Sequence, residues 1–345
     1  MTTIDTPSRP RKRAATIVDV AQTASVAVGT VSRHLNGLPV RARNRDRIER
    51  AIHELGFHRN ANAVAMKTDT THIVGFFVPS LSEFHAAMLE QLTRKMRPKG
   101  RAVLSLVHDL QPASIREGLE FFARHRVDAI VVDGEEAVQR ELEPYVEQGL
   151  DVVLYDNDAP GLVADRVFVS NRKSSARLVS HLLELGHRRI ATIHGDPWDT
   201  AGAERLGGYM DALAAFSLQP DPALVRNGHW QEVDAYERTL ELLQLPEPPT
   251  AIFSANYNMT LGVIARLREE NVSIPDHMSL VGFDDVAALR LHNPAITTVS
   301  QPIEKLANTI SALIDRRLTN PAAMGRRAIT IDCEILLRDS VRRLF

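Results

Sequence analysis

The stretch Thr16-Ile-Val-Asp-Val-Ala-Gln-Thr-Ala-Ser-Val-Ala-Val-Gly-Thr-Val-Ser-Arg-His-Leu-Asn-Gly37 contains two short helical patterns joined by a tight turn. Thr16 is a favourable N-cap for the first helix, and the second is expected from about Ala27 to Asn36. One face of the second helix is apolar. Its other face is small, polar and cationic, with Val28 at the border, and consists of Gly29, Ser32, Arg33 and Asn36.

A third helix is expected from Asn44 to Leu55, ending at Gly56. Three short helices around one small core, with an exposed helix that carries arginine, are typical of a helix-turn-helix DNA-binding unit. The charge distribution supports a DNA-binding head, because residues 1–68 hold twelve Lys and Arg against five Asp and Glu. The whole chain of 345 residues has a net charge of −2. A basic head on an acidic body is typical of a nucleic-acid reader joined to another domain.

The remainder alternates short β-rich runs with helical stretches, which predicts parallel sheets with crossover helices. Alternation breaks near Val167 and then restarts, which indicates two successive α/β lobes. The predicted strands are Ile73–Val78, Ala102–His108, Ala129–Val132, Val152–Tyr155, Val167–Val169, Arg189–Ile193, Ile252–Ser254 and Ser279–Phe283. No apolar run spans a bilayer, no secretory signal pattern begins the chain, and Cys333 is the single cysteine, so a reducing cytoplasm is expected.

The head resembles that of the lactose/galactose repressor (LacI/GalR) family, through Thr16-Ile-Val-Asp-Val-Ala21, Thr30-Val-Ser-Arg-His-Leu-Asn36 and Leu55-Gly-Phe57. The resemblance implies that Val28 and Gly29 vary with operator sequence and that Arg33 reads a base edge, for which a bidentate contact with guanine is suited. It also implies backbone-contacting positions, which are Thr16, Thr30, Ser32, Asn36, Arg45 and Arg47. Two residues depart from the family pattern: Ser25 replaces a glycine, and Ala27 replaces a serine N-cap.

Residues 59–71 would be the family's hinge, which folds on the operator and inserts an apolar side chain into the minor groove. Asn60 lies in this segment, and Met66 takes the wedge position. Val64 replaces the usual arginine. The alternative is a plain interdomain linker.

The resemblance extends over the body through Leu182–Ile190, Glu204–Tyr209, Ser279–Asp285 and Ile296–Pro302. It implies a periplasmic-binding-protein-like effector domain of two lobes with three crossovers. The expected organisation is a disordered basic arm (1–15), the head (16–58), the hinge (59–71) and an effector-binding and dimerisation domain (72–345). Its first lobe would hold about 72–166 and 297–325, and its second about 167–296 and 326–345.

An effector is expected between the lobes, at the carboxyl ends of the strands. Carboxylates there accept hydrogen bonds from vicinal hydroxyls, and an aromatic face packs on a sugar ring. The predicted effector-binding residues are Ser80, Phe84, Asp156, Asp199, Arg205, Trp230, Asn256 and Asp284. Tyr257 and Ser170 replace aspartates usual in the family.

The sequence therefore predicts a homodimeric repressor that binds a near-palindromic operator under the control of a small effector, a sugar or sugar derivative. No cofactor or metal is expected. A nucleobase or nucleoside effector, or partial activation, remains an alternative. A transport-type sugar-binding module would lack the DNA head. An α/β enzyme would need a nucleotide or catalytic motif, and none occurs. The thirteen histidines are scattered. The sequence contains no apolar heptad tail, so a tetramer formed through such a tail is not expected.

Overall fold

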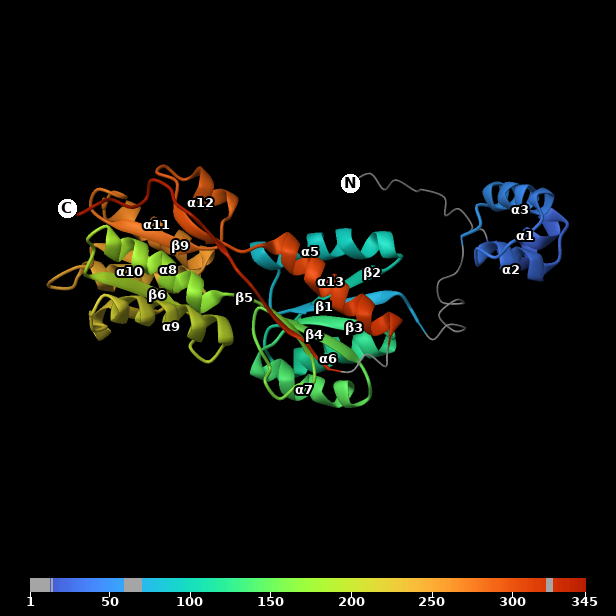
Figure 1. Cartoon of the computed structure of the whole chain (residues 1–345), viewed down its shortest axis with the longest axis horizontal. Coiled ribbons are helices and arrows are strands. Elements are labelled where there is room, and N and C mark those ends of the chain that lie inside the picture. The colour runs from blue at the N-terminus through green and yellow to red at the C-terminus, as the bar shows by residue number, and fades with distance from the viewer. Residues whose placement is uncertain (1–12, 14, 59–69, 321–324) are drawn as a thin grey trace, which may run out of the picture. The chain divides into compact units, whose positions relative to one another are not determined.

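The computed structural model describes residues 13, 15–58, 70–320 and 325–345 (Figure 1). The chain divides into two compact units, Met1–Thr71 and His72–Phe345. Most of the predicted arm over residues 1–15, and the hinge residues Asn60, Val64 and Met66, lie outside the described residues. Their predicted roles therefore stay predictions from sequence.

The first unit is built from α1 (Ile17–Ala24), α2 (Val28–Leu35) and α3 (Ala42–Leu55). Thr16 caps α1 in a reciprocal box: its hydroxyl oxygen accepts the Asp19 N–H, and the Asp19 carboxylate accepts the Thr16 N–H at 2.7 Å. Helix α3 begins two residues before the predicted Asn44, because its first turn is exposed and carries no apolar period to mark it.

One buried residue from each helix forms the centre of the small core of this unit, namely Val20, Val31 and Ile48. Ala27 is the N-cap of α2, and its methyl side chain cannot accept a hydrogen bond from the first turn of the helix. Apolar packing through Val31 and Leu35 therefore holds α2 in place, on the apolar face that the sequence predicts.

The second unit consists of two lobes, each with a six-stranded sheet. In the first, the order is β11-β5-β4-β3-β1-β2, with bounds β1 (Ile73–Val78), β2 (Ala102–Val107), β3 (Ala129–Asp133), β4 (Asp151–Tyr155), β5 (Asp165–Val169) and β11 (Ala328–Ile331). In the second, it is β12-β10-β9-β8-β6-β7, with bounds β6 (Ile190–His194), β7 (Val225–Asn227), β8 (Ala251–Ser254), β9 (Ser279–Phe283), β10 (Thr297–Ser300) and β12 (Glu334–Leu336). Every pairing is parallel except β10 with β12.

Helices cover both faces of each sheet, which explains why the inner strands read as continuous apolar runs. In the first lobe α5 (Glu83–Met96) and α13 (Ile303–Thr319) pack together, as do α6 (Pro112–Arg124) and α7 (Glu136–Glu147) (Figure 1). In the second lobe α8 (Asn171–Glu184) pairs with α9 (Thr200–Ala215), and α10 (Glu232–Leu243) with α11 (Tyr257–Glu269). The short helix α12 (Ala287–Leu291) follows β9.

The chain crosses between the lobes three times, as expected, but each crossover lies later than predicted. Residues 167–169 and 328–331 belong to the first sheet, and 297–300 to the second. The predicted boundaries at 166/167, 296/297 and 325/326 therefore cut off β5, β10 and β11 from their own sheets. For β5 the reason is that a loop without a helix joins it to β4, and in the sequence this loop resembles a lobe boundary.

Candidate functional site

The exposed face of α2 carries the residues expected to meet DNA. Val28 is 42% exposed, Arg33 and Asn36 are exposed, and a Cβ placed on Gly29 would meet no described atom within 4 Å. Among the described residues, the guanidinium of Arg33 donates only a long hydrogen bond, of 3.4 Å, to the Pro39 carbonyl. This face can therefore approach a groove closely with one long cationic side chain.

The other predicted DNA contacts differ in how available they are. Arg45 is exposed, whereas Thr30, Ser32 and Arg47 are half-buried. The Thr16 hydroxyl is used within the cap, since it donates to Asp19 Oδ2 at 2.7 Å. Phosphate oxygens accept hydrogen bonds, and both donors of Thr16, its hydroxyl and its backbone N–H, already donate to Asp19, so the exposed arginines are the stronger candidates for phosphate contacts.

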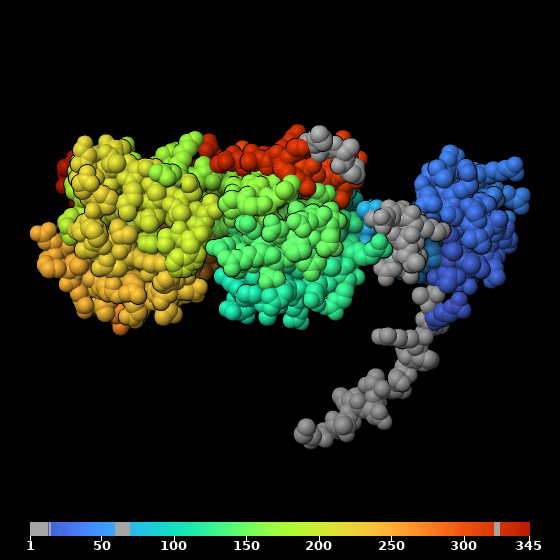
Figure 2. Space-filling view, turned by 90° about the horizontal axis from the view of Figure 1, so that it is seen from below, coloured from blue at the N-terminus to red at the C-terminus, as the bar shows by residue number. Residues whose placement is uncertain are grey.

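A cavity of about 390 Å³ lies between the two lobes, which meet along a crease (Figure 2). Seven of the eight predicted effector residues line it, and these are Ser80, Phe84, Asp156, Arg205, Trp230, Asn256 and Asp284. Asp199 is not in the lining. It caps α9 through the Gly202 N–H and accepts the Trp230 Nε1–H at 2.6 Å, so it positions the indole from behind.

Arg205 is anchored rather than loose. It is only 3% exposed, its Nε donates to Asn171 Oδ1 at 2.9 Å, and a second nitrogen donates to the Ala255 carbonyl at 2.7 Å. Its guanidinium carbon lies 3.7 Å from the centre of the Phe283 ring. These contacts fix the direction of the one permanent positive charge in the described lining.

Trp230 presents its ring to the cavity because the local backbone allows a close approach. His229 and Trp230 both have left-handed φ values, of 47° and 61°. A Cβ on Gly195 would lie 2.0 Å from the indole. The ring therefore fills the space above a glycine, and strained backbone of this kind is often found at ligand sites.

Two of the residues that depart from the family pattern have different surroundings. The Tyr257 hydroxyl accepts the backbone N–H of Glu83 at 3.0 Å, so it links the second lobe to the first at the cavity. Ser170 does not line the cavity. It contacts the Ser174 hydroxyl at 3.0 Å near the first crossover, and it therefore does not alter the chemistry of the cleft directly.

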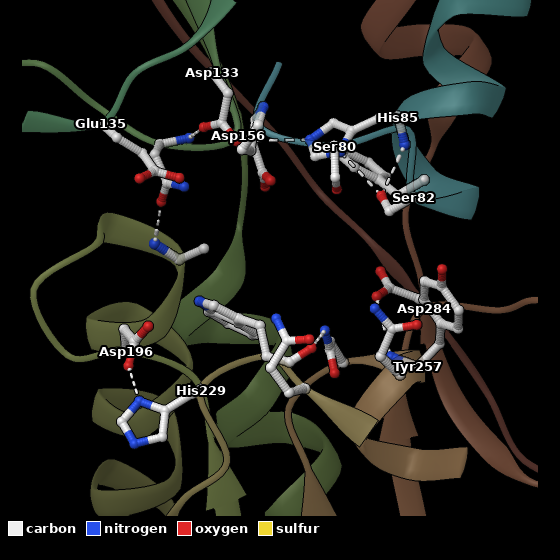
Figure 3. A pocket seen from close by; sticks show the side chains of 18 of the residues that line it. Ser80, Ser82, His85, Asp133, Glu135, Asp156, Asp196, His229, Tyr257 and Asp284 are labelled. Atoms are coloured by element: carbon white, nitrogen blue, oxygen red, sulfur yellow. Dashed lines mark hydrogen bonds and ion pairs between the residues drawn. The ribbon is translucent and has the colours of Figure 1, made fainter. Parts of the chain in front are cut away.

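The first-lobe wall gathers titratable groups that the sequence reasoning missed. His85 Nε2 lies 3.6 Å from Asp133 Oδ2, and both side chains are buried beside Asp156 (Figure 3). Burial raises the pKa of Asp156 to about 7, and the nearby negative charge of Asp133 contributes to this shift. Burial, with Asp133, also raises the pKa of Glu135 to about 8. For His85, burial lowers the pKa, but Asp133, Asp156 and the Ser80 backbone together more than offset this, and the net shift is upward.

The opposite wall, from the second lobe, carries Asp196, His229, Tyr257 and Asp284 (Figure 3). Asp196 Oδ1 accepts a hydrogen bond from His229 Nδ1 at 2.6 Å. Asp284 Oδ1 accepts one from the side-chain amide of Gln301 at 2.7 Å. Asp133 ends β3 and Asp196 lies two residues after the end of β6, so the rule that selected Asp156 and Asp284 also points to them. His85 gave no such signal, because it lies inside a helix.

Comparison with known proteins agrees with both halves of this arrangement. Residues 16–60 match the family model of bacterial regulatory proteins, lacI family, and residues 179–341 match a periplasmic binding protein-like domain. The transcriptional regulator GalR of Escherichia coli K12 is 32% identical over 303 residues, covering 87% of this chain and 88% of its own. This chain belongs to the lacI family.

Other lacI-family proteins are similar over nearly the full length. The transcriptional repressor PurR of Haemophilus influenzae is 28% identical over 96% of this chain and 99% of its own. A complex of the regulator CelR with cellobiose superposes with a TM-score of 0.71 at 26% identity, over 94% of this chain and 99% of that one. A lac repressor dimer bound to operator and the anti-inducer ONPF has the same fold, with a TM-score of 0.84 at 21% identity over 96% and 100%.

The protein is therefore a DNA-binding transcriptional repressor of the lacI family and not an enzyme. The predicted fold, a helix-turn-helix head followed by a two-lobed α/β domain with parallel sheets, is confirmed. No helix among the described residues is long and apolar enough to cross a membrane.

Proposed function

We propose that this repressor releases or binds its operator in response to a small polyhydroxylated effector, a sugar or sugar derivative, held between the two lobes. The observation that carries the proposal is the cavity itself, which combines hydrogen-bonding carboxylates, the anchored Arg205 and the ring of Trp230. Carboxylates that accept paired hydroxyls, together with a flat apolar face, suit a sugar ring. The similarity to a regulator solved with cellobiose also supports a sugar.

The second candidate effector is a nucleobase or nucleoside. Phe84 and Trp230 both line the cavity, and a planar base can stack on either ring. Relatives named PurR and GalR are similar to this chain to nearly the same degree, so identity favours neither ligand. The site residues are proposals in both cases.

A thermal-shift panel separates the two candidates. A ligand that binds the folded state raises its apparent stability by mass action, by about 2.7 kcal/mol at 100 times its Kd. We expect a shift with a mono- or disaccharide and none with purine or pyrimidine bases. A shift with bases alone would transfer the assignment to the second candidate. If neither saccharides nor bases raise the melting temperature, both candidate effectors are contradicted.

We further propose that the protein acts as a cytoplasmic homodimer on a near-palindromic operator, since one head offers few base contacts and two half-sites are needed for affinity. The similarity to a repressor dimer on its operator supports this. Analytical ultracentrifugation at about micromolar concentration, well above the specific affinities typical of such complexes, tests it. A monomer with and without DNA would contradict the proposal.

The domain roles follow from the same proposal. Residues 16–58 read DNA, 59–71 act as the hinge with Met66 as the minor-groove wedge, and 72–345 bind effector and dimerise. Replacing Met66 with glycine is expected to weaken operator binding while leaving the effector affinity of the free protein unchanged. Equal loss of both affinities would argue against a separate hinge function.

A further inference from the structure

The first-lobe wall of the cavity contains an arrangement of donors that a sugar site does not require. His85 extends from α5, Asp133 ends β3, and Asp156 follows β4, so three neighbouring elements bring their donors together (Figure 3). One nitrogen or oxygen atom from each lies within 4.8 Å of the others. We call these three residues the first-lobe triad.

The triad contains polar atoms that hydrogen bonds leave unsatisfied. His85 is 7% exposed, and its Nε2 accepts or donates no hydrogen bond among the described residues. Asp156 Oδ1 is likewise buried without one among them. Buried donors and acceptors in folded proteins nearly always have a partner, so these two atoms are suited to bind a ligand.

The other nitrogen of His85 indicates what the missing group is. Nδ1 lies 2.9 Å from the Ser82 hydroxyl, and in the tautomer in which Nδ1–H donates to Ser82 the Nε2 atom presents a lone pair to the triad. A lone pair facing the Asp133 carboxylate at 3.6 Å is repelled unless a positive charge lies between them. A proton on Nε2 would give a charge-assisted hydrogen bond, but these are about 2.7–2.9 Å long.

The spacing between His85 and Asp133 fits a metal ion better. Two donors about 2.0–2.2 Å from one Zn²⁺ ion, at angles of roughly 90–120°, lie about 3–3.7 Å apart. The 3.6 Å between His85 Nε2 and Asp133 Oδ2 falls in this range. One neutral imidazole and two carboxylates also balance the charge of a divalent ion and suit a transition metal rather than a hard cation.

We propose that the first-lobe triad binds a divalent transition-metal ion whose remaining coordination positions open into the effector cavity. The ion would neutralise the excess of carboxylates there, since six of the described lining residues are acidic and one, Arg205, is permanently cationic. The part of the inference that concerns the effector rests on the proposed function. Hydroxyl or carboxylate oxygens of an effector would complete the coordination shell of the ion.

The test uses the full chain without an affinity tag, stripped with a chelator and titrated with Mn²⁺ under electron paramagnetic resonance, and with Zn²⁺ by calorimetry. We expect one ion per chain, and at least tenfold weaker binding in His85→Gln and Asp156→Asn. Pulsed resonance should show coupling to one imidazole nitrogen that disappears in His85→Gln. The control variants Asp196→Asn and His229→Gln remove the matched pair from the opposite wall and should keep the ion.

Operator binding by each variant shows that it is folded. If neither Mn²⁺ nor Zn²⁺ binds at concentrations of about 1 mM, far above the dissociation constants usual for protein metal sites, the proposal is overturned. Binding of glucosamine by the stripped protein with no uptake of either metal would overturn it as well, because an ammonium group would then be the missing cation. Both outcomes leave the sugar panel unaffected, so failure here is distinguishable from failure of the proposed function.

Discussion

Asp156 and Asp284 occupy equivalent positions in the two lobes. Each directly follows the third strand in the order of its sheet, β4 or β9, and each has a left-handed backbone, with φ values of 61° and 74°. Their surroundings differ. Asp284 accepts the Gln301 amide at 2.7 Å, whereas Asp156 Oδ1 is buried without a hydrogen bond among the described residues. Two equivalent carboxylates thus face one cavity, one already oriented and one available to a ligand.

Replacing Asp284 with alanine is expected to abolish the effector response while leaving operator affinity nearly intact. A charged hydrogen-bonding group contributes about 1.5–3 kcal/mol, which corresponds to roughly 10- to 150-fold in effector affinity. Titration with the effector identified in the panel and a labelled operator measures both quantities. Asp276→Ala, an exposed substitution in the same lobe, is the control. A normal response of Asp284→Ala would place the effector site elsewhere.

Replacing Arg33 with alanine is expected to reduce discrimination at one base pair in each half-site by about 1–3 kcal/mol. Arg45→Ala should instead weaken binding to all sequences alike and reduce the salt dependence, since Arg45 is predicted to contact the backbone. Fluorescence anisotropy over a library of single-base operator variants at several salt concentrations distinguishes the two effects. Identical profiles for both variants would show that Arg33 does not read a base.

Tyr257→Phe removes the hydrogen bond that the Tyr257 hydroxyl accepts from Glu83 N–H across the lobes. A single neutral hydrogen bond contributes about 0.5–1.5 kcal/mol, so effector affinity should fall by roughly 2- to 13-fold if effector binds the form in which the lobes are joined. Tyr236→Phe is the matched control, because the Tyr236 hydroxyl donates to Glu269 within the second lobe. Calorimetric titration of both variants is the measurement, and equal affinities would exclude a role for this contact.

Asp165→Asn is expected to destabilise the first lobe in a pH-dependent way. Burial alone would raise the pKa of Asp165, but hydrogen bonds from Arg317 and the Arg327 amide hold it below its usual value. Because the pKa is lowered on folding, the stabilisation is complete above the unfolded value of about 3.9 and is lost as the pH falls through the folded value.

At neutral pH the variant removes the carboxylate that neutralises the buried Arg317 guanidinium, at a cost of about 3–5 kcal/mol in the free energy of unfolding. Denaturant unfolding at pH 7 and below pH 4 measures this, and the gap between variant and parent should narrow in acid. Asp332→Asn, which breaks the exposed pair with Lys173, should leave the unfolding midpoint unchanged. A gap that stays constant with pH would show that the pair does not titrate as described.

Helical and strand periodicity predicted the fold class, because Val20, Val31 and Ile48 recur at core spacing and the inner strands are apolar throughout. The strand-end rule predicted Asp156, Asn256 and Asp284 at one cavity, and four further residues predicted as their neighbours also line it. Periodicity does not show which sheet a short strand joins, and so β5, β10 and β11 were assigned to the wrong lobe. It also does not show that His85 faces two aspartates some 50 and 70 positions away, since a helix face is fixed only by packing.

The three crossovers also determine when the body can finish folding. The outer strand of the first sheet, β11, pairs with β5 after an interval of some 160 residues, and β12 reaches β10 only after β11 has been made. On the ribosome both sheets therefore stay one strand short until almost the same moment. Neither lobe can therefore complete its sheet before the other. Both lobes should finish folding together, late in synthesis and at the slow rate that long-range strand pairing imposes.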